Sequence, residues 1–296
     1  MIDVNKVVKT FDGFRALDEL TLQVPTGAVY GLVGPNGSGK STIIRHITGV
    51  YRPDSGSITV DGLPVYENPS VKERIASIPD ELFAFTSDSI SDMHAFYKSV
   101  YKNYDEHMFA RLREVFRLDK KQAIRRFSKG MQKQAAFWLS LCLRPEILIL
   151  DEPVDGLDPV MRRQVWSLML ESVADRGTTV LVASHNLREL EDVCDHVGIL
   201  HKGKMMLQRS LADLQDAIVK VQLVLPEGAE PTGLEVLHET RLGRVRTLIV
   251  RGSQQEVTSR LAGLHPLICD LLPLSLEEIF IYELGGADYA VKDIVL

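Results

Sequence analysis

Glycines and a lysine gather in one short segment of the 296-residue chain, after an apolar run and before a helical pattern. The segment reads Gly34-Pro35-Asn36-Gly37-Ser38-Gly39-Lys40-Ser41-Thr42. Glycines let a backbone wrap phosphate oxygens with its N–H groups, and a following helix points its positive end at the anion. A glycine-rich turn that binds nothing is the alternative. The order of strand, loop and helix favours a nucleotide site lined by residues 34–42, with Lys40 on the β- and γ-phosphates and the Ser41 hydroxyl on Mg²⁺.

Two adjacent carboxylates, Asp151 and Glu152, end a second apolar run at residues 147–150. Parallel strands deliver ligand groups at their carboxyl ends, which places this pair beside the glycine-rich loop. We expect Asp151 to hold Mg²⁺ through water and Glu152 to polarise an attacking water as general base. An acidic strand-to-loop boundary is common by itself. The loop at residues 34–42 is what makes the catalytic interpretation the stronger one.

A third segment lies shortly before the carboxylate pair and reads Phe127-Ser128-Lys129-Gly130-Met131-Gln132. The three motifs together resemble those of the ATP-binding cassette (ABC) ATPases, whose Leu-Ser-Gly-Gly-Gln signature stands in this place. The resemblance implies that Ser128 and Gly130 contact the γ-phosphate of ATP bound to the opposite subunit. A hydroxyl and amides at a helix N-terminus do form an anion site. Two positions depart from the family pattern, since Lys129 replaces the first glycine and Met131 replaces the glutamine.

Four further elements of the sequence match that family. Gly156-Leu157-Asp158 resembles the loop that crosses the subunit interface, and His185 resembles the histidine that reads the γ-phosphate; a lone histidine is otherwise more often structural. Phe11 stands where the family places an aromatic ring against adenine, with a core role as the alternative. Asp80 stands where the family usually has a glutamine, and its carboxylate suits Mg²⁺ or a water bound to it, because hard cations prefer oxygen ligands.

The elements that must position these residues follow from hydrophobic periodicity. Strands are predicted at residues 2–8, 16–24, 28–33, 57–60, 74–78, 147–150 and 178–183, and helices at 41–48, 159–174 and, as a pattern, about 90–143. Apolar strands flanked by helices predict a parallel sheet covered on both faces. After about residue 210, strands are predicted at 217–225, 244–251 and 267–272, and helices at 255–264 and 275–284.

With the resemblance, these patterns predict the fold class. We expect an α/β P-loop NTPase cassette with a mostly parallel core sheet, an N-terminal antiparallel β part, a helical insert at about 85–143 and a small C-terminal α+β appendage. The cassette would span residues 1–215 and the appendage residues 216–296. The appendage resembles the C-terminal regions of ATPase subunits of bacterial ABC-2-type exporters, above all at residues 274–280. An amphipathic helix packed on its own domain is the favoured interpretation of Leu276, Ile279 and Phe280.

Composition excludes several classes of protein. The chain is 45% hydrophobic and 25% charged, which is typical of a globular protein and not of a disordered one. It contains no apolar run of about 18 residues that spans a bilayer, and its start lacks the apolar core of a secretory signal and is interpreted as the mature N-terminus. Its three cysteines are interpreted as reduced thiols of a cytosolic protein, and its net charge of -6 argues mildly against nucleic acid as a partner.

The resemblance implies an ATP-binding and hydrolysing subunit of an ABC transporter, an exporter that closes as a dimer on ATP and Mg²⁺. Its partners would be a separately encoded transmembrane permease and either a second copy or another ABC ATPase, at the cytoplasmic face of a bacterial membrane. Aromatic residues of the insert are candidates for a permease-docking groove, with core packing as the alternative: Phe83, Phe85, Phe96, Tyr97, Tyr101 and Tyr104. A soluble, non-transport cassette protein and a non-catalytic ATP-binding regulator are the alternative functions.

Overall fold

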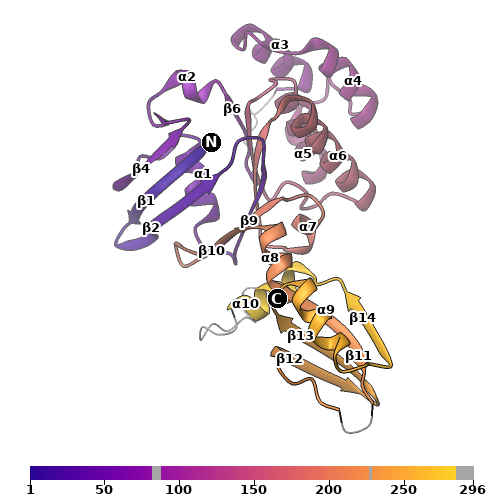
Figure 1. Ribbon diagram of the computed structural model, residues 1–296. Helices are drawn as coiled ribbons and strands as arrows, with labels where there is room; N and C mark the ends of the chain where they lie inside the picture. Colours follow the sequence, from indigo (N-terminus) through magenta and orange to yellow (C-terminus); the bar gives the residue numbers. More distant parts are fainter. Residues whose placement is uncertain (82–87, 227–228, 285–296) are drawn as a thin grey trace. The chain divides into compact units, whose positions relative to one another are not determined.

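A computed structural model of the chain describes residues 1–81, 88–226 and 229–284. The chain divides into two compact units, of which the first comprises residues 1–185 and 196–208 and the second residues 186–195 and 209–296 (Figure 1). The domain boundary predicted between residues 215 and 216 stays a prediction. Within the described ranges, no helix is long and apolar enough to cross a membrane.

An antiparallel sheet forms the N-terminal part of the first unit (Figure 1). Its strands, in spatial order, are β2 (Phe14–Val24), β1 (Ile2–Phe11), β4 (Ser55–Val60) and β5 (Leu63–Pro64). The hairpin between β1 and β2 turns at Asp12 and Gly13, which both have positive φ, as two-residue hairpin turns favour. The strands predicted at residues 2–8, 16–24 and 57–60 are confirmed.

A second, mostly parallel sheet carries the nucleotide motifs. Its strands, in spatial order, are β10 (Lys204–Ser210), β9 (His196–His201), β3 (Val29–Val33), β8 (Thr179–Ser184), β7 (Ile147–Asp151) and β6 (Ile75–Ile78). The neighbours from β9 to β6 all pair in parallel, and every residue of β3, β7 and β8 is buried. The prediction of a parallel core sheet is confirmed, although β9 and β10 were not among the predicted strands.

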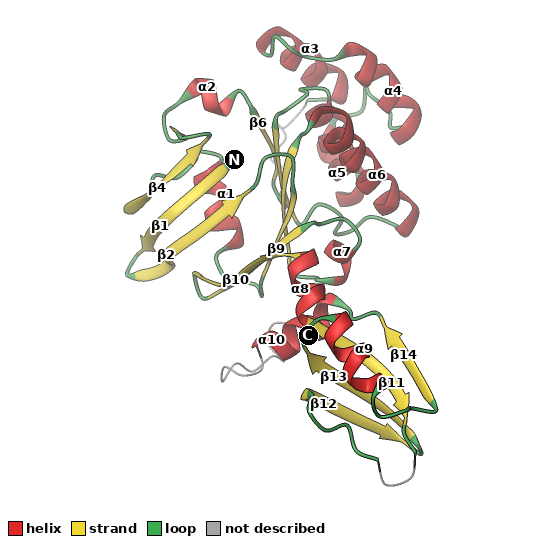
Figure 2. Cartoon of the chain, viewed as in Figure 1, coloured by secondary structure: helices red, strands yellow, loops and turns green. Residues whose placement is uncertain are grey.

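Helices accompany these sheets (Figure 2). They are α1 (Lys40–Ile47), α2 (Pro69–Lys72), α3 (Ile90–Val100), α4 (Glu106–Phe116), α5 (Lys129–Leu141) and α6 (Pro159–Arg176). The first four residues of a helix need outside partners for their N–H groups, and Ser89, Asp105, Ser128 and Asp158 cap four of these helices with their side chains. Helices α3, α4 and α5 confirm the helical pattern predicted at about 90–143.

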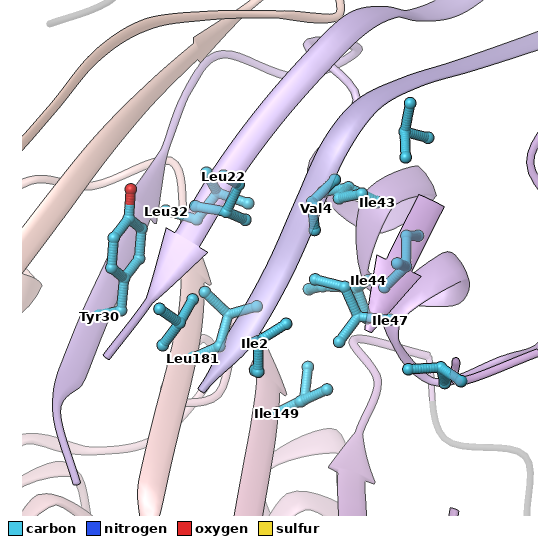
Figure 3. Close-up of a cluster of buried hydrophobic side chains, with 14 of the residues drawn as sticks. Ile2, Val4, Leu22, Tyr30, Leu32, Ile43, Ile44, Ile47, Ile149 and Leu181 are labelled. Atoms are coloured by element: carbon cyan, nitrogen blue, oxygen red, sulfur yellow. The ribbon is translucent and has the colours of Figure 1, made fainter. Parts of the chain in front are cut away.

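The core of the first unit holds α1 in place. Ile43, Ile44 and Ile47 of α1 lie against Ile2 and Val4 of β1, in a cluster that also includes side chains of β2, β3, β7 and β8 (Figure 3). Burying one such side chain contributes about 1.5–3 kcal/mol, so displacing α1 would be costly. The hydrophobic face of α1 therefore fixes the helix that begins at Lys40.

The second unit is an antiparallel sheet with short helices. Its strands, in spatial order, are β12 (Glu235–Leu242), β13 (Val245–Arg251), β11 (Ile218–Val224) and β14 (Ile268–Leu272), and its helices are α7 (Arg188–Glu191), α8 (Leu211–Ala217), α9 (Gln254–Ala262) and α10 (Leu276–Leu284). Val257 and Leu261 of α9 pack in a cluster with Leu248 of β13. Leu276 and Ile279 are buried, which confirms their predicted packing. The side chain of Phe280 lies outside the described part of the chain.

Candidate functional site

The polar groups singled out in the sequence follow neighbouring strands of the parallel sheet. Strand β3 leads into the glycine-rich loop, β7 ends at Asp151, His185 follows β8, and Asp80 comes two residues after β6. Because β3, β8, β7 and β6 are parallel, their carboxyl ends meet at one edge of the sheet. The register places Asp151 beside Ala183 of β8, two residues before His185.

The backbone of the loop at residues 34–39 accepts hydrogen bonds from the side chain of Lys40. Gly39 has a φ of 109° and precedes the first residue of α1, and a Cβ at this position would lie 3.0 Å from the carbonyl oxygen of Ala16. Only glycine adopts this conformation at such close approach without strain. The Lys40 ammonium is buried and donates to the carbonyl oxygens of Gly34, at 2.6 Å, and Pro35, at 3.3 Å.

The lysine, the glutamate and the histidine lie in a row. The Lys40 Nζ is 3.9 Å from Oε1 of Glu152, and the other carboxylate oxygen of Glu152 lies 2.9 Å from Nδ1 of His185. Burial lowers the pKa of Lys40, and the carboxylates of Glu152 and Asp151 oppose that shift. Glu152 is itself mostly shielded, whereas the His185 side chain is 53% exposed. The glutamate is thus held between a buried cation and a ring open to solvent.

Asp151 presents an oxygen with no protein partner. Its side chain is buried, and Oδ1 is among the buried atoms of the described residues that lack a hydrogen bond, as is the hydroxyl of Ser38. Burial raises the pKa of Asp151, while a hydrogen bond with Ser41 acts in the opposite direction. An unsatisfied carboxylate oxygen beside a hydroxyl is the donor set that Mg²⁺ prefers. Ser41 and Asp151, two of the three residues predicted to hold that ion, therefore fit it.

Asp80 is paired with a buried lysine that the sequence analysis did not single out. The Lys133 ammonium on α5 lies 3.3 Å from Oδ1 of Asp80 and donates to the carbonyl oxygen of Glu152 at 2.5 Å. The helical pattern predicted at about 90–143 includes this position, but periodicity does not separate a lysine that faces inward from one that faces solvent. Lys133 stands between Gln132 and Gln134 in the sequence, and this polar context gave no signal of burial.

The signature segment begins a helix, as predicted. Ser128 is the N-cap of α5, and its hydroxyl accepts a hydrogen bond from the Met131 N–H at 3.3 Å. Gly130 faces the loop at residues 156–158, because a Cβ added there would lie 2.7 Å from the carbonyl oxygen of Gly156. These two motifs therefore lie side by side within one chain. The contacts of Ser128 and Gly130 with nucleotide on an opposite subunit stay a prediction.

Phe11 lies at the end of β1, and its side chain is 36% exposed. Its ring packs edge-on against Tyr51, with 5.5 Å between centroids, and the Lys9 ammonium lies over it at 5.4 Å. The alternative of a core residue is therefore wrong, and its role against adenine stays a prediction. Thr42, the last residue of the predicted nucleotide site, lies in α1, where its carbonyl oxygen bonds to Nδ1 of His46 at 2.8 Å.

The aromatic residues proposed for docking in the helical insert differ in their exposure to solvent. Phe96 on α3 is 51% exposed, whereas Tyr97, Tyr101 and Tyr104 are partly buried. His94 stacks on Phe109 with 3.9 Å between ring centroids, so part of this aromatic group packs internally. Phe83 and Phe85, the preferred docking residues, lie outside the residues that the structure describes. A docking role for this surface stays a prediction.

Known proteins are similar to this chain over nearly its whole length and not only at the motifs. The family model described as "ABC transporter" matches residues 17–155. The ABC transporter ATP-binding protein YtrB of Bacillus subtilis (strain 168) is 30% identical over 290 residues, which cover 97% of this chain and 99% of that protein. The daunorubicin/doxorubicin resistance ATP-binding protein DrrA of Streptomyces peucetius is 31% identical over 223 residues, covering 73% of this chain and 67% of that protein.

A solved structure shows the same fold. The ATP-binding subunit of an ABC transporter superposes with a TM-score of 0.67 at 28% identity, covering 73% of this chain and 92% of that one. The chain has the P-loop and the carboxylate pair on one parallel sheet. It is also similar to YtrB over nearly its whole length. The chain therefore belongs to the ABC transporter family, as an ATP-binding subunit that hydrolyses ATP.

Proposed function

We propose that this protein is the ATPase of an exporter and that it drives a separate transmembrane permease by closing as a dimer on ATP. One observation carries the catalytic part. Lys40, Glu152 and His185 form a continuous row at the carboxyl edge of the parallel sheet, with separations of 3.9 and 2.9 Å. A buried cation, a shielded carboxylate and an exposed imidazole in contact are the groups needed to bind a phosphate, activate water and respond to the γ-phosphate.

In this proposal the loop binds the phosphates and Lys40 moves from its own backbone carbonyls to the β- and γ-phosphate oxygens. The phosphates add negative charge beside the buried ammonium, whose pKa burial lowers and the carboxylates of Glu152 and Asp151 only oppose. Glu152 accepts a proton from the attacking water, and His185 donates to the γ-phosphate. Phe11, beside Tyr51 at the edge of the β1–β2 hairpin, packs against the adenine ring.

Mg²⁺ is the proposed metal. Ser41 and Asp151 would hold it, directly or through water, and the unpartnered Oδ1 of Asp151 supports that assignment. A magnesium ion held by these residues would neutralise charge on the phosphate oxygens. Asp80, predicted as a third oxygen ligand, pairs with Lys133 in this structure, and it is not among the proposed ligands.

The dimer completes each site with residues of the other subunit. We propose that Ser128 and Gly130, at the N-terminus of α5, contact the γ-phosphate across the interface. One chain carries one P-loop and one signature, so a homodimer would hold two equivalent sites, and a heterodimer would pair this chain with another ABC ATPase. Hydrolysis removes the bridging phosphate, and the permease responds to the reopened interface.

Export is proposed from the names of relatives. The Nod factor export ATP-binding protein I of Rhizobium etli is 33% identical over 80% of this chain, and DrrA is described as a daunorubicin/doxorubicin resistance protein. An ATP-binding subunit of this kind would work at the cytoplasmic face of a bacterial membrane. The exposed Phe96 on α3 is one candidate contact with a permease helix.

The test is to replace Glu152 by Gln, which removes the base and keeps its shape. ATP turnover should fall at least about 100-fold, within the range for general acid–base catalysis, while ATP remains bound. Glu146→Gln is the matched control, because this glutamate precedes the same strand and is exposed at its far end. Turnover at the wild-type rate in Glu152→Gln would contradict the assignment of the base. Equal losses in both variants would mean that the effect is not local.

A further inference from the structure

Lys133 connects three segments that the ATPase motifs treat separately. It lies on α5, five residues after the cap Ser128, and its side chain is only 5% exposed. Its ammonium donates to the carbonyl oxygen of Glu152 at 2.5 Å and lies 3.3 Å from the carboxylate of Asp80. The signature helix, the loop after β6 and the turn after β7 therefore meet at one buried cation.

The backbone at Glu152 needs outside support. Its φ is 46°, in the left-handed region that residues with a side chain rarely occupy. Such conformations persist where surrounding groups hold them, and three hydrogen bonds do so here. The Glu152 N–H donates to Ala183 at 2.9 Å, and its carbonyl oxygen accepts from Lys133 at 2.5 Å and from the Asp155 N–H at 3.4 Å. Of the two donors to the carbonyl, the lysine is closer and carries the charge.

A buried ammonium requires compensation of its charge. Asp80 supplies it, with a side chain that is 51% exposed and so remains partly hydrated. Lys133 depends on Asp80 more than Asp80 depends on Lys133. Without Asp80, the lysine would be a buried, uncompensated cation, whereas without Lys133 the aspartate would still contact water. Asp80 therefore acts on the site through Lys133.

We propose that Lys133 is a positioning residue for ATP hydrolysis. It fixes the peptide at Glu152, and so the direction of the carboxylate, while Asp80 stabilises its charge. The proposal rests on the proposed role of Glu152 as general base. It also ties the direction of that carboxylate to the position of α5, the helix that Ser128 begins.

The test uses Lys133→Met, Asp80→Asn and the double variant of the purified full-length protein. For each, kcat and KM are measured with ATP and Mg²⁺, the Kd for ATP is measured without hydrolysis, and the melting temperature is measured without nucleotide. In Lys133→Met, kcat should fall about 10-fold or more, as expected for loss of a hydrogen bond from a charged group. Its Kd and melting temperature should stay near the wild-type values, because methionine is close to lysine in length and leaves no buried charge to compensate.

Asp80→Asn should lower the melting temperature, since it leaves the ammonium without a counter-charge. The double variant should match Lys133→Met in both kcat and melting temperature, because Asp80 has nothing to stabilise once the lysine is gone. A further fall in kcat in the double variant would overturn the statement that Asp80 acts through Lys133. A loss of melting temperature in Lys133→Met that accounts for its lost activity would overturn the positioning role.

Lys72→Met is the matched control. Its ammonium also donates to a backbone carbonyl, that of Gly49 at 2.9 Å, but it lies on α2, apart from the motifs. Its kcat should remain at the wild-type value. Glu152→Gln, measured alongside, separates the two proposals. If it is inactive while Lys133→Met turns over normally, only the positioning role is wrong; if it is active, both proposals fall.

Discussion

The two units of this chain use their sheets in different ways. In the first unit the central strands β3, β7 and β8 are buried along their whole length, as parallel strands covered on both faces are. In the second unit the edge strands β12 and β14 are mostly exposed, and the sheet is antiparallel. The contrast decides where polar groups are gathered, because only parallel strands bring all their carboxyl ends to one edge.

The two units also differ in how their charged side chains are paired. In the second unit Arg246 pairs with Glu239 at 2.7 Å and with Glu230 at 2.8 Å, and hydrogen bonds from Arg241 and Arg246 lower the pKa of Glu239. These side chains satisfy one another. In the first unit a buried oxygen of Asp151 has no partner among the described residues. A polar group left unsatisfied at a strand end indicates a place kept for a ligand, whereas paired charges on a sheet need none.

The largest expected effect tests whether the units are energetically separate. Leu248 is fully buried in the core of the second unit, and Leu248→Ala should lower the free energy of unfolding of that unit by about 3 kcal/mol. The affinity for ATP, which the first unit determines, should not change. Chemical denaturation and ATP titration measure the two quantities. Leu242→Ala, at a position 84% exposed, is the control. A parallel loss of ATP affinity would show that the second unit supports the nucleotide site.

Two lysines, one in each unit, test this difference in the pairing of charges. Lys40→Met should weaken ATP binding about 100-fold, because it removes charged hydrogen bonds to the phosphates, each worth about 1.5–3 kcal/mol. Lys220→Met in the second unit should leave it unchanged, since Lys220 already pairs with Glu278 at 2.6 Å. Equilibrium binding of ATP measures both. Similar affinities in the two variants would contradict the assignment of the phosphate site to the P-loop.

The smallest effect concerns His46, on the helix that begins at Lys40. Burial lowers its pKa below the ordinary value of 6.5, opposed by its hydrogen bond with the Thr42 carbonyl and reinforced by the charge of Lys9. The unfolded chain then binds the proton more readily, so this contribution to stability is present above pH 6.5 and is lost as the pH falls through the lower, folded pKa. Thermal unfolding between neutral and acidic pH should show this loss in the wild type and less of it in His46→Gln. His265→Gln, at an exposed position of the second unit, is the control.

Much of the first unit could be predicted because local patterns and tertiary demands agree there. Residues 34–42 combine glycines, a lysine and a following helical pattern, and α1 begins at Lys40, one residue before the predicted start. The strand before Asp151 is a continuous apolar run, which a fully buried strand allows. Strand β9 (His196–His201) escaped prediction although four of its six residues are buried, because histidines at both ends and a glycine break the apolar run.

The aromatic candidates show the opposite case. Phe96, one of the candidates, and Phe109, which was not among them, are similar in sequence terms, each on a helix of the insert. Only the packing places Phe96 toward solvent and stacks Phe109 on Trp138, with 4.9 Å between ring centroids. Periodicity gives a helix one apolar face, but the direction of that face depends on which other helices surround it.

The sequence by itself determined the chemistry of this protein: a phosphate loop, a carboxylate pair and a signature segment, each defined by residues that are neighbours in the chain. Tertiary structure decided what those motifs touch. Lys133 lies 53 residues from Asp80 and 19 from Glu152, and no local spacing relates the three. They meet because the loops after β6 and β7 leave one edge of a parallel sheet and α5 packs beside them. A buried ammonium is stable only where such distant groups converge, so its position follows from the fold.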